Sequence, residues 1–123
     1  MSDWDEEQPI FLQLARRITD QILQGTWSEG QSLPSVRLVA SDLKINHLTV
    51  MKGYQLLVDE GLVEKRRGQG MFVAEGAFEQ LLMSQKRCFI ETDIPAIATK
   101  LQRLNISISE FIERIEQHLE ENI

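Results

Sequence analysis

Residues 33–73 read LPSVRLVASDLKINHLTVMKGYQLLVDEGLVEKRRGQGMFV. Ser35 and Asn46 each precede a helical pattern of apolar residues, and each side chain can cap its helix by accepting a hydrogen bond from a first-turn N–H. The first helix is short and ends near Lys44, whereas the second continues to Gly61, a natural helix stop. Only two or three residues separate the helices. This outline is typical of a helix-turn-helix.

A β-hairpin is predicted directly after the second helix. Residues 62–65 and 71–73 are short runs typical of strands, and residues 66–70 between them form a basic, glycine-rich turn. A hairpin in this place is the wing of a winged helix, and the combination is far more specific than the helix-turn-helix outline alone. Residues 8–75 are therefore predicted to form a winged helix-turn-helix domain in a chain that is mostly α-helical.

An amphipathic helix is predicted before this stretch. Apolar residues recur at three- and four-residue steps from about Ile10 to Gln24, and Gly25 follows as a helix stop. The two glycines and the closing proline of residues 25–34 predict a loop, with one short strand around residues 31–33. Its tryptophan is expected to pack this loop onto the core.

Residues 76–123 show helical periodicity and no further strand. Pro95 lacks a backbone donor and disfavours helix in the residue before it, so residues 92–95 are expected to interrupt or kink the helical stretch. Ser107 and Glu110 have the spacing of a capping box, which predicts the start of a last helix.

These tail helices have no sheet to cover them and would make a poor independent core. Their apolar stripes are therefore expected to need a packing partner, so residues 76–123 are predicted to form a short all-α dimerisation tail. The residues predicted to take part are Phe78, Leu81, Leu82, Leu101, Leu104, Phe111, Ile112 and Ile115.

The overall charge argues at first against a nucleic-acid binder. The 123 residues hold 13 Lys and Arg against 19 Asp and Glu, a formal net charge of -6, whereas nucleic-acid binders usually show a basic excess. Residues 30–70 reverse this sign, because they hold six basic and four acidic residues. The acidic residues concentrate near the two ends, so the overall charge conceals a local basic face.

Composition also excludes several other classes of protein. The first residues are acidic and no apolar run approaches the roughly 20 residues that span a bilayer, so neither a signal peptide nor a membrane helix is expected, and the chain is predicted to be cytoplasmic. The single cysteine, Cys88, cannot form an internal disulfide and is expected to be a small packed residue. His47 and His118 are widely separated, so the sequence suggests no metal site. It also contains no pairing of a nucleophile with a base and no phosphate loop, so neither an enzyme nor a cofactor is indicated.

The sequence resembles the GntR family of bacterial transcription regulators. The resemblance rests on Leu33–Arg37, Thr49–Val50, Glu60–Val63 and Arg67–Val73, which occur in the order and spacing of that family, and it covers residues 8–75. The short tail, together with the run TVMKGY, is similar to the YtrA subfamily. The resemblance implies a winged-helix regulator that dimerises through its C-terminal helices and often represses nearby transporter genes.

The helix-turn-helix geometry and the resemblance together predict which residues contact double-stranded operator DNA. The first turn of the recognition helix faces base edges in the major groove, and the wing reaches the backbone or the minor groove. Arg37 lies where the family places an arginine on the DNA, and Arg66 and Arg67 add charge to a wing whose glycines allow close approach. The full predicted set is Ser35, Arg37, Asn46, His47, Leu48, Thr49, Lys52, Arg66, Arg67, Gly68, Gln69 and Gly70.

The recognition helix departs from the family at three positions. His47 and Met51 stand where many members carry arginine, so the base preference of the family does not transfer to this chain. Gly53 stands where alanine is usual, at a cost to the helix of roughly 1 kcal/mol. The close approach of another helix would explain this glycine.

Each assignment has a structural alternative. Arg37 could be a solvated helix charge, the wing arginines could keep a hairpin edge soluble, and His47 could simply be exposed. Thr49 could close the helix start without reading a base, and Tyr54 is expected to be a core residue with its hydroxyl at the surface. The alternative for the whole chain is a winged-helix adaptor that binds protein. An unidentified small-molecule effector would need a site between subunits.

Overall fold

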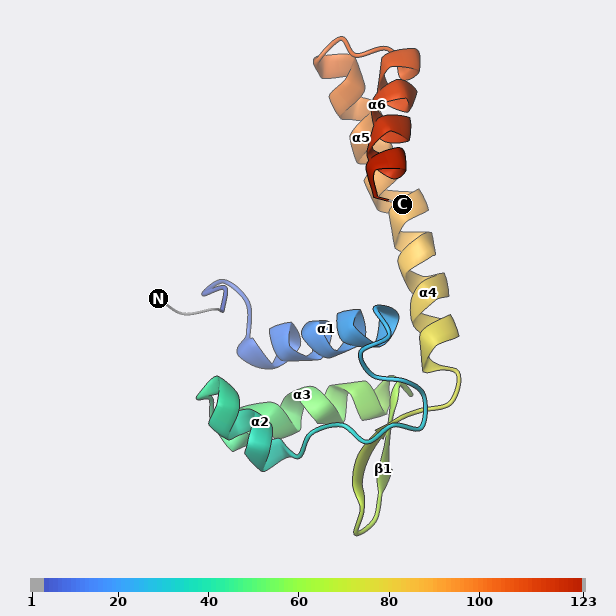
Figure 1. Cartoon of the computed structure of the whole chain (residues 1–123). Helices are drawn as coiled ribbons and strands as arrows, with labels where there is room; N and C mark the ends of the chain where they lie inside the picture. The colour runs from blue at the N-terminus through green and yellow to red at the C-terminus, as the bar shows by residue number, and fades with distance from the viewer. Residues whose placement is uncertain (1–3, 123) are drawn as a thin grey trace. The chain divides into compact units, whose positions relative to one another are not determined.

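The structure is a computed structural model that describes residues 4–122. By its internal contacts the chain divides into two compact units, Met1–Met83 and Ser84–Ile123. The structure confirms a mostly helical chain with one small antiparallel hairpin (Figure 1). In chain order the elements are α1 (Ile10–Leu23), α2 (Val36–Leu43), α3 (His47–Asp59), β1 (Val63–Arg66), β2 (Gly70–Val73), α4 (Ala77–Cys88), the π-helix η1 (Phe89–Asp93), α5 (Ile94–Arg103) and α6 (Ile108–Glu121).

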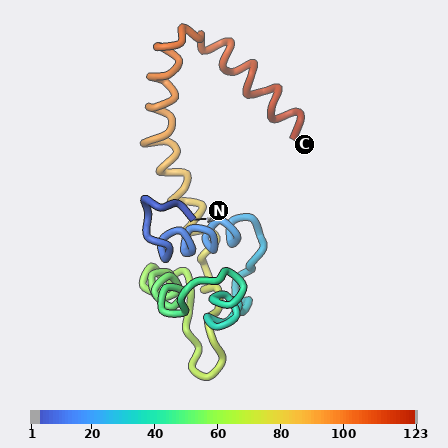
Figure 2. The backbone as a smooth tube through the Cα atoms, turned by 90° about the vertical axis from the view of Figure 1, so that its left-hand side faces the viewer, coloured from blue at the N-terminus to red at the C-terminus, as the bar shows by residue number. Residues whose placement is uncertain are grey.

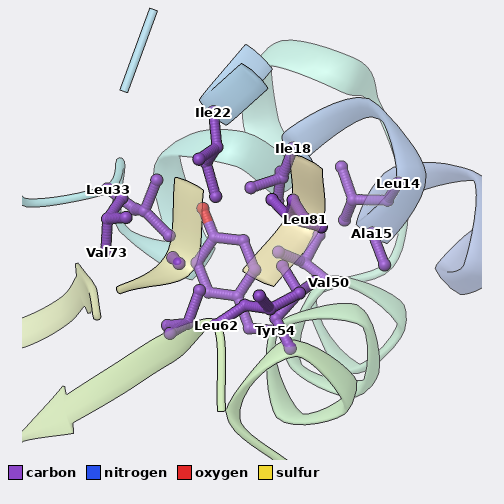
Figure 3. Close-up of a cluster of buried hydrophobic side chains, with 13 residues drawn as sticks. Leu14, Ala15, Ile18, Ile22, Leu33, Val50, Tyr54, Leu62, Val73 and Leu81 are labelled. Atoms are coloured by element: carbon purple, nitrogen blue, oxygen red, sulfur yellow. The ribbon is translucent and has the colours of Figure 1, made fainter. Parts of the chain in front are cut away.

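The core of the first unit lies around α3, which packs against α1, α2 and β1. Buried side chains from α1, α3 and the hairpin gather around the ring of Tyr54, as Figure 3 shows, and partly buried side chains of α2 pack against this cluster. The apolar stripe predicted for the first helix supplies Leu14, Ile18 and Ile22 to this cluster. The predicted loop tryptophan, Trp27, packs against the core and donates a hydrogen bond from Nε1 to Gln21 Oε1 at 2.7 Å.

Gly53 lies where α3 crosses α1. A Cβ atom at this position would lie 3.1 Å from the backbone oxygen of Phe11 and 3.3 Å from Cδ2 of Leu14. These distances are tighter than ordinary van der Waals contact, so a larger residue at this position would require Phe11 or Leu14 to shift. The expectation that a neighbouring helix explains Gly53 is confirmed.

The hydroxyl of Tyr54 differs from the sequence prediction. The residue is 1% exposed, and its hydroxyl donates a hydrogen bond of 2.7 Å to the backbone oxygen of Pro34. The prediction of a surface hydroxyl was therefore wrong, because the loop before α2 folds over the ring and offers a carbonyl acceptor. Burial raises the pKa of Tyr54 to about 12. The bond ties α3 to the start of α2.

Both predicted helix caps of the helix-turn-helix are confirmed. Ser35 Oγ accepts a hydrogen bond from the N–H of Leu38 at 3.1 Å, and Asn46 Oδ1 accepts one from the N–H of Leu48 at 2.8 Å. Lys44 ends α2 in the left-handed region with a φ of 55°. A single left-handed residue therefore turns the chain from α2 toward α3.

The hairpin pairs Val63 with Val73 and Arg66 with Gly70 in an antiparallel register. The predicted strand around residues 31–33 is reduced to one bridge, between Ser32 and Phe72. On either side of this bridge, the N–H of Gly30 donates to Val73 and the N–H of Leu33 donates to Met71. The loop thus covers the outer edge of β2 and fixes the base of the hairpin.

The predicted interruption at residues 92–95 takes another form. Helical winding continues through the π-helix η1 into α5, and Pro95 lies in the first turn of α5. The N–H of Ile94 donates to the carbonyl of Phe89, five residues earlier. This wider turn accommodates the proline, which would otherwise clash with a carbonyl of the preceding turn. The predicted start of the last helix is confirmed, because Ser107 Oγ accepts a hydrogen bond from the N–H of Glu110 at 3.1 Å. The Glu110 carboxylate lies 3.7 Å from Arg114 Nη2.

The second unit buries little of its apolar surface. Within α5 and α6 no side chain is buried, and only Ile97, Leu101 and Phe111 are half-buried. Cys88 is exposed, so the prediction of a packed cysteine was wrong; a single chain provides no core around that turn of helix. No helix within residues 4–122 is long and apolar enough to cross a membrane.

Candidate nucleic-acid interface

The outward face of α3 carries the side chains that were predicted to contact base edges in the major groove. Three side chains of this helix, Val50, Tyr54 and Leu57, are buried in the core, and Thr49 is half-buried beside the cap. The opposite face is open to solvent. Its exposed side chains are His47, Leu48, Met51, Lys52, Gln55 and, at the end of the helix, Asp59, which accepts a hydrogen bond from Gln55 Nε2 at 2.8 Å.

Lys52 lies against α1 rather than standing free on this face. Its Nζ is 4.3 Å from the centre of the Phe11 ring, which is a cation–π contact. The side chain is nevertheless exposed, so the charge remains available to a phosphate. The contact holds this charge on the side of α3 that faces α1.

The start of α2 carries a second cationic group. Arg37 is exposed in the first turn, two residues after the Ser35 cap. First-turn N–H groups and the positive end of the helix dipole add to the charge of this side chain. The arrangement is suited to an anionic group such as a DNA phosphate.

The two arginines of the hairpin have different environments. The guanidinium of Arg66 lies 4.0 Å from the centre of the Phe72 ring, and its Nε is 3.8 Å from Glu64 Oε1. This ion pair is partly exposed and therefore weak, but together with the ring it holds Arg66 along the strand. Arg67 is exposed in the turn. Because Figures 1 and 2 show the turn extending away from the three helices, Arg67 is the more accessible charge.

The turn is shaped by glycines. Gly68 and Gly70 have φ values of 75° and 111°, a region that other residues rarely adopt. The N–H of Gln69 donates to the carbonyl of Arg66 at 2.9 Å and closes the turn. The absence of Cβ atoms at two of these positions leaves the backbone open to close approach.

A groove of about 490 Å³ lies between the start of α2, the outward face of α3 and the hairpin. It brings together five of the twelve predicted residues. The seven that lie outside its lining are Arg37, Asn46, His47, Leu48, Thr49, Lys52 and Arg67. The predicted residues that line it are Ser35, Arg66, Gly68, Gln69 and Gly70.

Three further residues with side chains suited to DNA contact line the groove, and the predicted set omitted them. They are Met51, Gln55 and Lys65. Met51 and Gln55 continue the face of Leu48 at helical spacing, so the periodicity of the helix could have identified them. The register of the hairpin places Lys65 opposite Met71, which also lines the groove.

Comparisons with known proteins agree with this geometry. The family model described as bacterial regulatory proteins, gntR family, matches residues 11–73. The HTH-type transcriptional repressor YtrA of Bacillus subtilis is 33% identical over 98 residues, which cover 80% of this chain and 69% of that protein. The match to YtrA therefore extends beyond the winged helix.

Solved structures show the same architecture. A GntR family transcriptional regulator from Listeria monocytogenes superposes with a TM-score of 0.76 at 27% identity, covering 93% of this chain and 98% of that one. The structure of AraR(DBD) in complex with operator ORR3 has a TM-score of 0.50 at 28% identity, covering 52% of this chain and 77% of that one.

Proposed function

Because the chain belongs to the GntR family of bacterial transcription regulators, we propose that it is a homodimeric repressor that binds a dyad-symmetric operator. The name of YtrA as a repressor supports the direction of regulation. The complex of AraR(DBD) with its operator supports double-stranded DNA as the partner. A protein with this role works in the bacterial cytoplasm, where operator DNA is located.

The observation that carries the proposal is the convergence of α3, the start of α2 and the hairpin on one groove. In this assignment the first turn of α3 enters the major groove, and the hairpin follows the adjacent backbone or minor groove. Arg37 in the first turn of α2 and Arg67 in the turn of the hairpin are exposed cations on two of these elements. Both are proposed to bind phosphate, and Arg37 also has the reach of a guanine edge.

Residues 8–75 are proposed as the DNA-binding part and residues 76–123 as the dimerisation part. Exposed apolar side chains support the second assignment, since Ile112 is 47% exposed and Leu104 is 63% exposed in the single chain. Leu81 is excluded from the proposed dimer surface because it belongs to the core of the first unit. The proposed surface consists of Phe78, Leu82, Leu101, Leu104, Phe111, Ile112 and Ile115.

A two-variant binding experiment tests the proposal. Operator fragments are selected from genomic DNA with the wild-type protein, and affinity is then measured for the double variant Arg37→Ala with Arg67→Ala. We expect each lost contact to weaken binding by about tenfold. Arg103→Ala is the matched control, because it removes an exposed arginine of α5 from the proposed dimerisation part. A double variant that keeps its circular dichroism spectrum and binds operator as wild type would favour the protein-binding adaptor.

A further inference from the structure

The recognition face of α3 contains two large apolar side chains that the core does not use. Leu48 is 61% exposed and Met51 is 49% exposed. They are three residues apart, so they lie on the same face of the helix. Packing within the chain therefore gives no reason for an apolar residue at either position.

Positive charge frames this apolar pair. Met51 lines the groove together with Lys65 and Arg66, and no acidic residue of the described chain lines it. Arg37 and Arg67 are exposed on the neighbouring elements. A protein partner of general apolar character would not require this frame. DNA does require positive charge on both sides of the apolar pair, because its phosphates lie on both sides of a recognition helix in the major groove.

The side chains of Leu48 and Met51 restrict what they can read on a base. Leucine has no hydrogen-bonding group, and the thioether of methionine is only a weak acceptor, so neither can recognise guanine or adenine through donors and acceptors. The major groove presents one apolar group on its base edges, the C5-methyl group of thymine. An apolar pair on the recognition helix is therefore complementary to thymine.

We infer that Leu48 and Met51 are specificity-determining residues that contact thymine methyl groups in each operator half-site. This inference rests on the proposed function, because it requires α3 to enter the major groove. It assigns the base preference that the family resemblance could not transfer. Operators selected by this protein contain thymine at one or two fixed positions opposite the first two turns of α3.

Replacement of thymine by deoxyuridine tests the inference, since it removes only the methyl group. Each thymine of a selected operator is replaced in turn, and the affinity of the wild-type protein is measured. Burial of one methyl group corresponds to about a fourfold change in affinity. We expect an affinity loss of about fourfold when deoxyuridine replaces thymine at one or two positions per half-site. At the other thymine positions we expect the affinity to change by less than about twofold.

Variants of Met51 identify the side chain that is responsible. Met51→Leu keeps an apolar group and preserves the preference for thymine over deoxyuridine at its position, whereas Met51→Gln loses the preference. Leu48→Ala is tested in the same way. Both side chains are exposed, so the fold is retained, and circular dichroism checks this.

Three results overturn the inference, and they distinguish its failure from failure of the proposed function. Sequence-specific binding that is insensitive to deoxyuridine at every position, or a preference that persists in both Met51→Gln and Leu48→Ala, overturns the thymine assignment alone. The apolar pair would then be assigned to a protein partner. Absence of any sequence-specific DNA binding overturns the proposed function together with the inference.

Discussion

Ionisation of Tyr54 provides a sharp test of the core, because it is the only tyrosine of the chain. Burial raises its pKa from 10.0 to about 12 in the folded protein. The neutral hydroxyl donates to the carbonyl of Pro34, and a tyrosinate could not make this bond. The near-ultraviolet absorbance of tyrosinate therefore reports this one residue.

The effect on stability has a definite sign. The folded-state pKa lies above the unfolded value, so the contribution to stability is fully present below pH 10 and is lost between about pH 10 and pH 12. A shift of two pKa units corresponds to up to about 3 kcal/mol in the free energy of unfolding. Tyr54→Phe removes this pH dependence, and it also lowers stability at neutral pH by about 1–2 kcal/mol because the Pro34 carbonyl loses its donor.

The assay combines a spectroscopic titration with denaturant unfolding at several pH values. We expect a tyrosinate midpoint near pH 12 in the folded protein and near pH 10 in strong denaturant. In Tyr54→Phe the denaturation midpoint should change less between pH 10 and pH 12 than in wild type. A folded-state titration near pH 10, or equal pH dependence in both proteins, would refute the description of Tyr54 as a buried donor.

Three further outcomes are expected. Gly53→Ala lowers the free energy of unfolding by about 1 kcal/mol despite the better helix propensity of alanine, because its Cβ meets the Phe11 carbonyl; a more stable variant in denaturant unfolding would contradict the close crossing. Asn46→Ala lowers the free energy of unfolding by about 1 kcal/mol through loss of the α3 cap. Thermal unfolding followed by circular dichroism would show no loss of stability if the cap were unimportant. Ile112→Asp yields a monomer in sedimentation and weakens operator binding, whereas a dimer of unchanged affinity would exclude Ile112 from the dimer surface.

Local chemistry explains why much of the fold could be predicted from sequence. The Ser35 and Asn46 caps depend on hydrogen bonds within two or three residues, and both form as expected. The position of Gly53 at a helix crossing followed from an unusual residue in an otherwise helical pattern. These features require no knowledge of distant parts of the chain.

Features that depend on distant neighbours were predicted less well. The acceptor of the Tyr54 hydroxyl is 20 residues away in sequence, so no local pattern placed that hydroxyl inside. Cys88 was expected to be packed, but its surroundings in a single chain are open. Residues 92–95 were expected to interrupt or kink the helix; the α-helical winding gives way there to the π-helix η1, whose type no local pattern indicated. In the candidate interface, pairing across the hairpin brings Lys65 to the groove, which a list of basic residues could not show.

The salt dependence of operator binding is the sharpest measure of DNA binding through α3 and the hairpin. Each phosphate contact contributes about 0.9 to the slope of the logarithm of affinity against the logarithm of salt concentration. We expect a steep negative slope for wild type and a slope smaller by about one per half-site for Arg67→Ala, whose charge lies exposed in the turn. A wild-type affinity that does not change with salt, or an unchanged slope in Arg67→Ala, would contradict DNA binding through α3 and the hairpin.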